Sequence, residues 1–576
     1  MTHSRFERYR AVMDVPESAL CWNLYGVGLG QMGRNGRPER IPIPRPGPDE
    51  LLARVDAVSL CYSDVKVCRL GNEHPKLRGR DLASEPTRLG HEVALTVAGV
   101  GTALADRYRV GQRLALQPDV YRDGTSIAYG YVIPGGLVQF QLLGPEILRG
   151  GYVLPVADGL GYAETALSEP WACVEAAYTQ RRRLEPKPGG TMWILGASPD
   201  SGSYEIPGTL LRSATIVTTR VPPSLLDRLR RTFGGHIVER NDTSDDEFEL
   251  LSSEHAGGEG FDDIVLLEPR KARTVAAALS VLARRGTLNL MARERLDAPV
   301  PVDAGRIHYD MLAIVGNTGP DIAASYGAAR NRCELRPEGT LAVIGAGGPM
   351  GQMHVQRAIE LPAGPRTIIA SEVNSTRLAA LSARFSPLAE RHGKHLVAVD
   401  ASEDERALDA ASQRLTGGTG IDDVVVCVPT ASAISAGARL LKPDGMLVLF
   451  AGVPHGTSVE LELSAVSRHS AQFTGTSGST LADQEAILGK AGAGQLSMNR
   501  SVAAIGGIDS ARDGLSAVMD ARFAGKVVLF PQLANLPLTP LAELPQAHPS
   551  VAKALDEEGM WSQRAESSLI EEFWKP

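Results

Sequence analysis

The fold is decided by a short apolar strand that leads into a glycine-rich turn, Thr340-Leu341-Ala342-Val343-Ile344-Gly345-Ala346-Gly347-Gly348-Pro349-Met350-Gly351. A turn of this kind, placed between a strand and a helix, lets backbone N–H groups and the helix N-terminus approach a pyrophosphate. The next predicted strand, 367–371, is followed by Glu372. A carboxylate at that point accepts hydrogen bonds from ribose hydroxyls and repels a 2′-phosphate. The stretch therefore predicts a dinucleotide-binding unit.

The residues that we expect at the cofactor lie where the parallel strands of this unit end. They belong to the glycine-rich turn, to the end of the second strand and to two later loops: Gly345, Gly347, Gly348, Gly351, Glu372, Gly452, Val453 and Gly475. The turn is one residue longer than a strict G-x-G-x-x-G motif, which leaves its register open. Glu372 favours NAD(H) over NADP(H), and the alternative is that it is a surface charge at a strand end.

The same succession of segments occurs earlier in the chain. Thr191-Met192-Trp193-Ile194-Leu195-Gly196-Ala197 corresponds to 340–346, Phe261-Asp262-Asp263-Ile264-Val265 to 421–425, and Val315-Gly316-Asn317-Thr318-Gly319 to 474–478. Matches in the same order, with strands alternating with amphipathic helices, predict two consecutive Rossmann-like units with doubly wound parallel sheets.

The first unit differs at the positions that would bind phosphate. Its turn, Gly196-Ala197-Ser198-Pro199-Asp200-Ser201-Gly202, lacks the central glycines and carries a negative charge at Asp200. Arg220 stands where the second unit has Glu372. We predict a structural copy that binds no dinucleotide, while an arginine at this position is also what a 2′-phosphate would require.

Residues before about 185 form a β-rich region that contains a possible metal constellation. Its three segments are Cys61-Tyr62-Ser63-Asp64, Gly90-His91-Glu92 and Ser168-Glu169-Pro170. A catalytic zinc takes about three protein ligands and keeps one position open. Cys61, His91 and either Glu92 or Glu169 satisfy that requirement.

Two further side chains complete this hypothesis. Asp64 would accept the far N–H of His91 and so fix the tautomer of the ligand. Ser63 would hydrogen-bond the substrate oxygen and pass on its proton. Zinc would stabilise a developing alkoxide while hydride leaves carbon. We therefore assign Ser63, Asp64 and Glu169 to catalysis, and Cys61, His91, Glu92 and Glu169 to the metal.

These segments, together with Leu89-Gly90-His91-Glu92 and Val110-Gly111-Gln112-Arg113, resemble the catalytic domain of medium-chain dehydrogenases/reductases. Within that family the chain is similar to the sorbitol dehydrogenase and sorbose-1-phosphate reductase branch. The resemblance implies a GroES-like β-domain, a single catalytic zinc, an NAD(P) cofactor, a polyol, sugar or sugar-phosphate substrate, and a homo-oligomer. Tyr62 stands where the family usually has glycine, and the extra Rossmann unit is absent from the ordinary family plan.

We accordingly expect an α/β chain of four parts. These are a GroES-like catalytic zinc domain at 1–185, a degenerate Rossmann-like unit at 186–330, an NAD-binding Rossmann unit at 331–500, and a segment at 501–576 that returns to the catalytic domain through the strand around Gly525-Lys526-Val527-Val528-Leu529.

Composition restricts the partners. The 576 residues carry a net charge of -8, so no global basic field attracts nucleic acid. No apolar run is long enough for a bilayer and no secretory signal opens the chain, which favours the cytoplasm. None of the six cysteines forms a C-x-x-C pair, which excludes a four-thiolate zinc lobe built on such pairs. The run Arg181-Arg182-Arg183 is predicted to be a solvated helix face.

The leading function is a zinc-dependent oxidoreductase that exchanges hydride between NAD(H) and a carbinol or carbonyl carbon. One alternative is a zinc-free quinone- or enoyl-type reductase on the same fold, and another is a non-catalytic dinucleotide sensor or scaffold. Four basic residues near the predicted metal site, Lys76, Arg78, Arg80 and Arg88, are candidates for a substrate phosphate, and exposed loop charge explains them as well.

Overall fold

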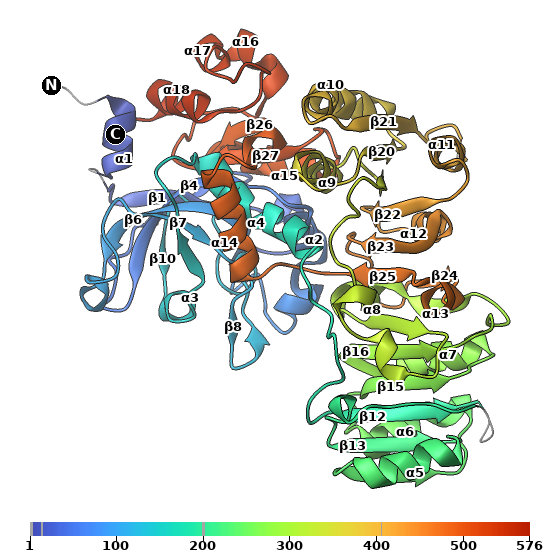
Figure 1. The fold of residues 1–576 in the computed structure, drawn as a ribbon. Helices are drawn as coiled ribbons and strands as arrows, with labels where there is room; N and C mark the ends of the chain where they lie inside the picture. Colours follow the sequence, from blue (N-terminus) through green and yellow to red (C-terminus); the bar gives the residue numbers. More distant parts are fainter. Residues whose placement is uncertain (1–3, 13–14, 198–201, 405, 576) are drawn as a thin grey trace. The chain divides into compact units, whose positions relative to one another are not determined.

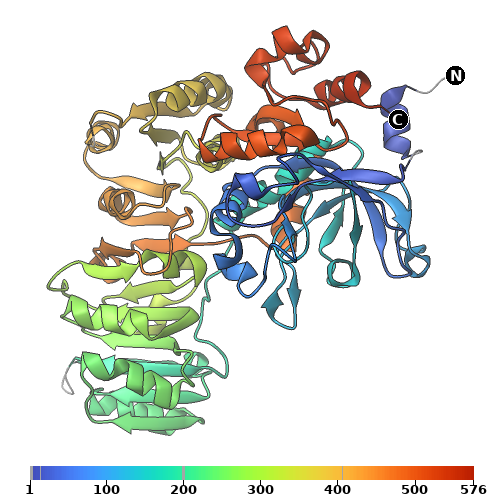
Figure 2. The same cartoon turned by 180° about the vertical axis from the view of Figure 1, so that it is seen from behind.

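The computed structural model describes residues 4–12, 15–197, 202–404 and 406–575 (Figures 1 and 2). The chain forms two compact units. Unit 1 comprises residues 1–175, 348–353 and 478–576, and unit 2 comprises residues 176–347 and 354–477. No helix in the described part of the chain has the length and apolar character that a bilayer crossing requires.

Unit 1 is built on an eight-stranded sheet that joins both ends of the sequence. The central strand β4 (Leu51–Ser59) is buried along its whole length and pairs antiparallel with β6 (Glu92–Val100) and with β27 (Lys526–Phe530). The sheet is completed by β7 (Arg113–Leu116), β10 (Phe140–Leu143), β11 (Val153–Pro155), β26 (Val502–Gly507) and β28 (Thr539–Pro540). The segment after residue 500 therefore supplies strands to the sheet of the β-rich region, as its pattern predicts.

Unit 1 also contains several helices, two of which begin at or carry a candidate metal ligand. They include α2 (Tyr62–Leu70), α4 (Tyr162–Ala176), α14 (Leu481–Gly492), α15 (Ala511–Met519) and α18 (Gln563–Phe573). The sequence prediction assigns α14 to the second Rossmann unit, but the structure groups it with unit 1. Gln484 of α14 donates to the Ser168 hydroxyl at 3.0 Å, and Lys490 pairs with Glu175 at 2.7 Å.

Unit 2 contains two six-stranded parallel sheets with the same strand order, 3-2-1-4-5-6 within each copy. The first copy is composed of β12 (Thr191–Gly196), β13 (Thr215–Thr219), β14 (His236–Arg240), β15 (Phe261–Leu267), β16 (Leu282–Met291) and β18 (Ala313–Asn317). The second copy is composed of β19 (Thr340–Ile344), β20 (Thr367–Glu372), β21 (His395–Asp400), β22 (Ile421–Val426), β23 (Leu441–Leu449) and β25 (Gln472–Gly475). The predicted fold class, a GroES-like domain with two Rossmann-like sheets, is confirmed.

The helices that connect these strands differ between the copies at one place. The first copy has α5 (Pro223–Thr232), α6 (Phe248–His255), α7 (Ala272–Ser280) and α8 (Ala304–Tyr309), and the second has α9 (Pro349–Glu360), α10 (Ser375–Arg391), α11 (Ala407–Thr416), α12 (Ala431–Arg439) and α13 (Ser464–His469). The helix α9 follows the glycine-rich turn of the second copy. In the first copy, the described residues between β12 and β13 form only the short 3-10 helix η5 (Gly208–Leu210). Among the described residues of this connection, the expected α-helix between two strands is not found.

The two copies pack edge to edge within unit 2. Strand β17 (Val300–Asp303) of the first copy pairs antiparallel with the corresponding strand β24 (Ser458–Leu461) of the second. The helix α8 of the first copy lies on the edge strand β25 of the second, and α13 of the second lies on β18 of the first (Figure 1). Each copy thus presents the same elements to the other, which is the arrangement of an isologous interface. One hydrophobic core, containing residues of both sheets, runs through this interface.

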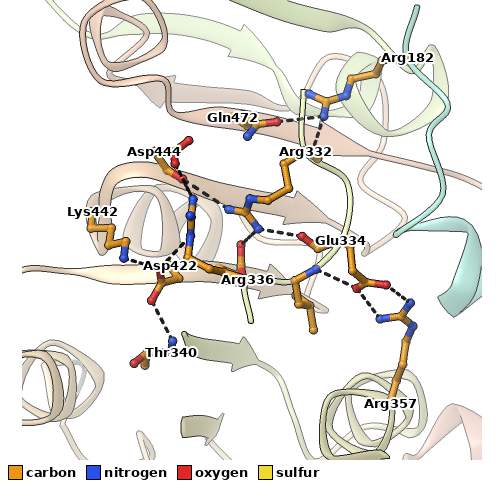
Figure 3. A network of polar contacts seen from close by, with 12 residues as sticks. Arg182, Arg332, Glu334, Arg336, Thr340, Arg357, Asp422, Lys442, Asp444 and Gln472 are labelled. Carbon is orange, nitrogen blue, oxygen red and sulfur yellow. Dashed lines mark hydrogen bonds and ion pairs between the residues drawn. The ribbon is translucent and has the colours of Figure 1, made fainter. Parts of the chain in front are cut away.

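The amino-terminal ends of the strands are tied by the same hydrogen bonds in both copies. In the second copy, the Thr340 N–H donates to Asp422 Oδ2 at 2.9 Å and the Arg336 N–H donates to Asp423 Oδ2 at 2.7 Å. Arg332 adds an ion pair with Asp423 at 2.6 Å. Figure 3 shows this network, with Asp422 between Thr340 and Lys442.

The first copy repeats this pattern. Thr191 N–H donates to Asp262 Oδ2 at 2.9 Å, Lys187 N–H donates to Asp263 Oδ2 at 2.9 Å, and Arg183 pairs with Asp263 at 3.0 Å. The double aspartate of each copy therefore holds the chain that enters its first strand, and the two short sequences echo each other for this structural reason.

The arginine run 181–183 belongs to these networks, and the prediction of a solvated helix face is wrong. The helix α4 ends at Ala176, before the run begins. Arg182 is buried and donates to the Arg332 carbonyl at 3.0 Å and to Gln472 at 3.3 Å (Figure 3). Burial lowers the pKa of Arg182 to about 10. Backbone carbonyl groups of both Rossmann units accept hydrogen bonds from Arg182 and Arg183. The sequence of three arginines does not indicate these acceptors.

Candidate metal and cofactor sites

The first candidate ligand is presented by the N-terminus of a helix. Cys61 is the N-cap of α2, and the Asp64 carboxylate accepts its N–H at 3.0 Å through Oδ2. The Cys61 side chain in turn faces the Asp64 N–H, so the two residues form a capping box. The spacing Cys-x-x-Asp therefore starts the helix and places Cys61 at its N-terminus, directly after β4 and Leu60.

Asp64 also fixes the second segment. Its Oδ1 accepts the Gly90 N–H at 3.0 Å and lies 3.2 Å from His91 Nδ1. Gly90 has a φ of +88°, and a Cβ there would meet Val58 Cγ1 at 2.8 Å, so this turn requires glycine. With Nδ1 directed at a carboxylate, the other ring nitrogen of His91 is left for a ligand. Burial lowers the pKa of His91, but the Asp64 carboxylate reverses this effect and raises it well above the ordinary value.

Three of the predicted ligands come together. One ligand atom each from Cys61, His91 and Glu92 lies within 4.8 Å of the other two. Glu92 is fully buried; its Oε1 accepts from Lys526 Nζ at 2.6 Å, and its Oε2 accepts no hydrogen bond within the described ranges. A buried carboxylate oxygen without a donor is costly, and a cation at that point would satisfy it.

Glu169 lies close to this group but outside the set of three. It is on α4, directly before Pro170, and its Oε1 accepts from the Cys173 thiol at 3.5 Å. Burial raises the pKa of Glu169 to about 7, with His91 and Lys526 opposing the rise and Glu92 adding to it. These electrostatic partners place the Glu169 carboxylate beside the same site, so both acidic candidates face it.

Two residues that the sequence analysis missed complete the surroundings. Lys526 is buried beside Glu92 and pairs with this carboxylate at 2.6 Å. A single lysine in the apolar strand Lys526–Phe530 was a usable signal. Tyr131 has its ring 5.8 Å from the His91 ring and its hydroxyl in contact with the Ser63 side chain. Burial raises the pKa of Tyr131, so its hydroxyl stays protonated and polar.

The glycine-rich turn of the second copy is closed by the predicted acid. The Gly347 N–H donates to Glu372 Oε2 at 2.9 Å, and Glu372 Oε1 accepts the N–H groups of Val373 and Asn374. A Cβ at Gly347 would meet this carboxylate at 2.7 Å. Gly345 has a φ of +78°, and its Cβ would meet Val428 at 2.5 Å. Both glycines are required by the backbone of the turn, and Gly348 and Gly351 continue it into α9.

The two later loops differ in their surroundings. Val453 is buried and its N–H closes a tight turn onto the Ala451 carbonyl at 2.8 Å across Gly452. Gly475 ends β25 beneath α8 of the first copy, and a Cβ there would meet His308 Cα at 3.0 Å. This close approach is a structural reason for glycine at 475.

In the first copy, charged residues follow the carboxyl ends of the strands, where the second copy has its glycine-rich turn and later loops. Arg220, with a φ of +51°, lies 3.4 Å from Asp242. Glu268 pairs with Arg293 at 2.7 Å across the ends of β15 and β16. Pro199 and Asp200, to which the sequence analysis assigned the loss of the phosphate cradle, lie outside the described residues.

Comparison with known proteins gives two family matches. Residues 47–174 match the alcohol dehydrogenase GroES-like domain, and residues 349–489 match the zinc-binding dehydrogenase family. The first six-stranded sheet lies entirely between these two matches.

Three curated proteins are similar over about half of this chain. The uncharacterized protein YggP of Escherichia coli strain K12 is 31% identical over 310 residues, which cover 50% of this chain and 72% of YggP. The L-sorbose 1-phosphate reductase of Klebsiella pneumoniae is 29% identical over 308 residues, covering 50% and 73%. The mannitol-1-phosphate 5-dehydrogenase of Aliivibrio fischeri is 27% identical over 355 residues, covering 57% and 82%.

Proposed function

Because the chain belongs to the zinc-type medium-chain dehydrogenase/reductase family, we propose that it is a zinc-dependent oxidoreductase. It transfers a hydride between NAD(P)(H) and the carbinol or carbonyl carbon of a polyol, sugar or sugar phosphate. The observation that carries this proposal is the approach of the Cys61 thiol, the His91 imidazole and the Glu92 carboxylate, whose ligand atoms lie within 4.8 Å of one another.

The donor set fits zinc. Sulfur, nitrogen and oxygen donors are the ligands of catalytic zinc sites, and three protein ligands leave a fourth position open. Asp64 orients His91, and the free Oε2 of Glu92 is available to a cation. When bound, zinc supplies Lewis-acid stabilisation of negative charge on the substrate oxygen.

Between the two acidic candidates, we favour Glu92 as the third ligand. A carboxylate oxygen of Glu92 lies within 4.8 Å of the ligand atoms of Cys61 and His91. Its Oε2 lacks a donor among the described residues, and Lys526 donates to Oε1. We then place Glu169, a buried carboxylate, beside the site and outside the ligand set. Ser63, in contact with the Tyr131 hydroxyl, is the group that donates to the substrate oxygen and relays its proton.

We assign the cofactor to the second copy. Gly345, Gly347, Gly348 and Gly351 leave the backbone of the turn bare before the N-terminus of α9, where a pyrophosphate is stabilised. Glu372 sits against this turn and disfavours the 2′-phosphate of NADP(H). NAD(H) is therefore the preferred cofactor, and the substrate class follows two relatives that are named for sugar or polyol 1-phosphates.

The test is metal analysis combined with turnover. The full chain should contain about one zinc and reduce a ketose or ketose phosphate with NADH. Cys61→Ser and His91→Ala should each remove zinc and turnover together, with thermal stability nearly unchanged, because an open catalytic site stabilises its domain less than a closed structural site.

A second thiol on the same helix provides the control. Cys68 is buried in α2 and burial raises its pKa to about 12, so Cys68→Ala should retain zinc. Dinucleotide binding without zinc or turnover in the unaltered protein would favour a sensor, and undiminished turnover of zinc-free His91→Ala would favour a zinc-free reductase. Either result overturns the proposal.

A further inference from the structure

The four cations that follow α2 have different environments. Arg80 donates to the carbonyl oxygens of Glu85, Pro86 and Val132, and so holds its own loop together. Arg88 donates to Asn23 at 3.3 Å, within the small β2–β5 sheet (Asn23–Leu24 and Thr87–Arg88). Both guanidinium groups are engaged in structure. Arg78 is exposed on the surface.

Lys76 differs because it adjoins the candidate metal site. Its ammonium lies 4.6 Å from the centroid of the Tyr131 ring, and that ring lies 5.8 Å from the ring of His91. A single aromatic side chain therefore separates the ammonium from a proposed ligand. All three residues belong to unit 1.

The ammonium is held in place by a carboxylate. Lys76 Nζ is 3.2 Å from Asp119 Oδ1, and both side chains are about one-third exposed. Asp119 is itself fixed, since its N–H donates to Gln117 at 3.1 Å. The Asp119 charge acts on Glu169 as well, which puts the Lys76–Asp119 pair on the side of the site where Glu169 lies.

The neighbouring His74 packs against the same aromatic ring, and its pKa is lowered. His74 lies against the same Tyr131 ring, with centroids 5.4 Å apart, and its Nδ1 accepts the Lys76 N–H at 3.3 Å. Burial, together with the charges of Lys76 and Lys66, lowers the pKa of His74 to about 4. His74 is therefore neutral, and the charge of Lys76 is available to an anion.

We propose that Lys76 is the residue that binds the phosphate group of a phosphorylated sugar or polyol whose reacting oxygen lies at Cys61, His91 and Glu92. This inference rests on the proposed function and names the substrate class of that site. An ammonium has three N–H donors, of which Asp119 engages one. A phosphate carries nearly two negative charges, so it competes well with a single carboxylate for the remaining donors.

The experiment compares Lys76→Gln with Arg78→Gln in the zinc-loaded protein, using L-sorbose 1-phosphate and L-sorbose as paired substrates. Lys76→Gln should raise the KM for the phosphate about 10- to 100-fold, the loss expected for one charge-assisted hydrogen bond. The kcat, the zinc content and the kinetics with L-sorbose should change less than about twofold. Arg78→Gln should leave all of them unchanged.

Inorganic phosphate gives a readout that does not depend on turnover. It should bind the unaltered protein in calorimetry and bind Lys76→Gln at least about tenfold more weakly. Equal losses with both substrates, or equal losses in the two variants, would overturn the assignment of Lys76 while the proposed function stands. If neither substrate is turned over, the proposed function fails, and the phosphate titration then decides the role of Lys76.

Discussion

The two Rossmann-like copies of unit 2 are alike at one end of their sheets and different at the other. At the amino-terminal ends of the strands, Asp262 and Asp263 make the same backbone hydrogen bonds as Asp422 and Asp423. At the carboxyl ends, the second copy has a bare turn and the helix α9, whereas the described residues of the first copy have only η5 in that connection.

Strand register makes the difference specific. Leu290 pairs with Leu266 in the first copy, as Leu449 pairs with Val426 in the second. Three residues beyond Leu290 stands Arg293, and three beyond Leu449 stands Gly452.

The partners of these positions differ in the same way. Glu268 and Val428 each stand two residues beyond their strand partner, Leu266 or Val426. The first copy therefore closes its carboxyl edge with the Glu268–Arg293 ion pair, where the second has two uncharged residues.

This contrast separates what the fold needs from what a ligand needs. The hydrogen bonds that hold the segment before the first strand occur in both copies, because each sheet needs this segment fixed for its first strand to pair. Ligands of open parallel sheets bind outside the carboxyl ends of the strands, and only there do the copies diverge. The first copy also forms an interface with the second, through β17, α8 and β18.

The largest expected effect tests the shared end. Asp423→Ala should lower the free energy of unfolding of unit 2 by about 3 kcal/mol, because it leaves Arg332 and the Arg336 N–H without their buried acceptor. Asp263→Ala should cost a similar amount through Arg183 and the Lys187 N–H. Urea unfolding of both variants measures this equality.

Asp246→Ala, which removes an exposed carboxylate of the first copy, is the control and should change the unfolding free energy by less than about 0.5 kcal/mol. If only Asp423→Ala lowered the free energy of unfolding, the aspartate network would stabilise the second copy alone. The similar hydrogen bonds of the first copy would then contribute little to stability.

A smaller effect tests the interface. Leu461→Ala empties a fully buried position opposite Val300 of the first copy and should cost about 2 kcal/mol. Since one core serves both sheets, amide exchange should accelerate in β12 of the first copy as well as in β19.

Ile368→Ala is the control for this variant. Ile368 is as deeply buried in the second sheet, and Leu461 belongs to the core that spans both sheets. We expect Ile368→Ala to loosen β20 and its neighbours while protection in β12 is retained. Exchange that spreads into the first copy equally in both variants would show that cooperativity does not run through the β17–β24 seam.

The sequence predicts the parts of this molecule that depend on local order. Alternating strands and helices predict both sheets, and the short motifs around Cys61 and His91 predict two candidate ligands because each motif also builds its own turn or helix cap. The pairing of Glu92 with Lys526 joins residues 434 positions apart, and only the strand order of the completed sheet brings them together.

Other features lack a local signal. Tyr131 follows no recognisable motif, and its place beside His91 depends on how the loop before β10 folds back over the sheet. The described residues after β12 contain no counterpart of α9, and this difference is equally hard to foresee. The preceding strand and the following pair of aspartates occur in both copies. The burial of Arg182 depends on carbonyl groups from the second copy.

A further test compares Glu372, which ends β20 of the second copy, with Arg220, which follows β13 of the first copy. Glu372→Ala should weaken NAD about tenfold and relax discrimination against NADP, because it removes the proposed acceptor for ribose hydroxyls and the acceptor that holds the Gly347 N–H. Arg220→Ala should leave the affinity for both dinucleotides within about twofold. Calorimetry gives both affinities and should find one dinucleotide per chain; NADP binding that disappears in Arg220→Ala would reveal a working first site.

The variant with the smallest expected effect tests whether the Glu268–Arg293 ion pair alone prevents the first copy from binding a dinucleotide. Arg293→Ala removes a side chain that is 61% exposed, so its pairing with Glu268 contributes at most about 1 kcal/mol to stability. The dinucleotide stoichiometry should stay at one, since a pyrophosphate needs free N–H groups at a helix N-terminus and the described residues after β12 offer only η5. Titration of NAD and NADP into Arg293→Ala decides between two causes. A second equivalent of dinucleotide would mean that the charges at the edge were the barrier, whereas an unchanged stoichiometry places the loss of binding in the backbone that follows β12.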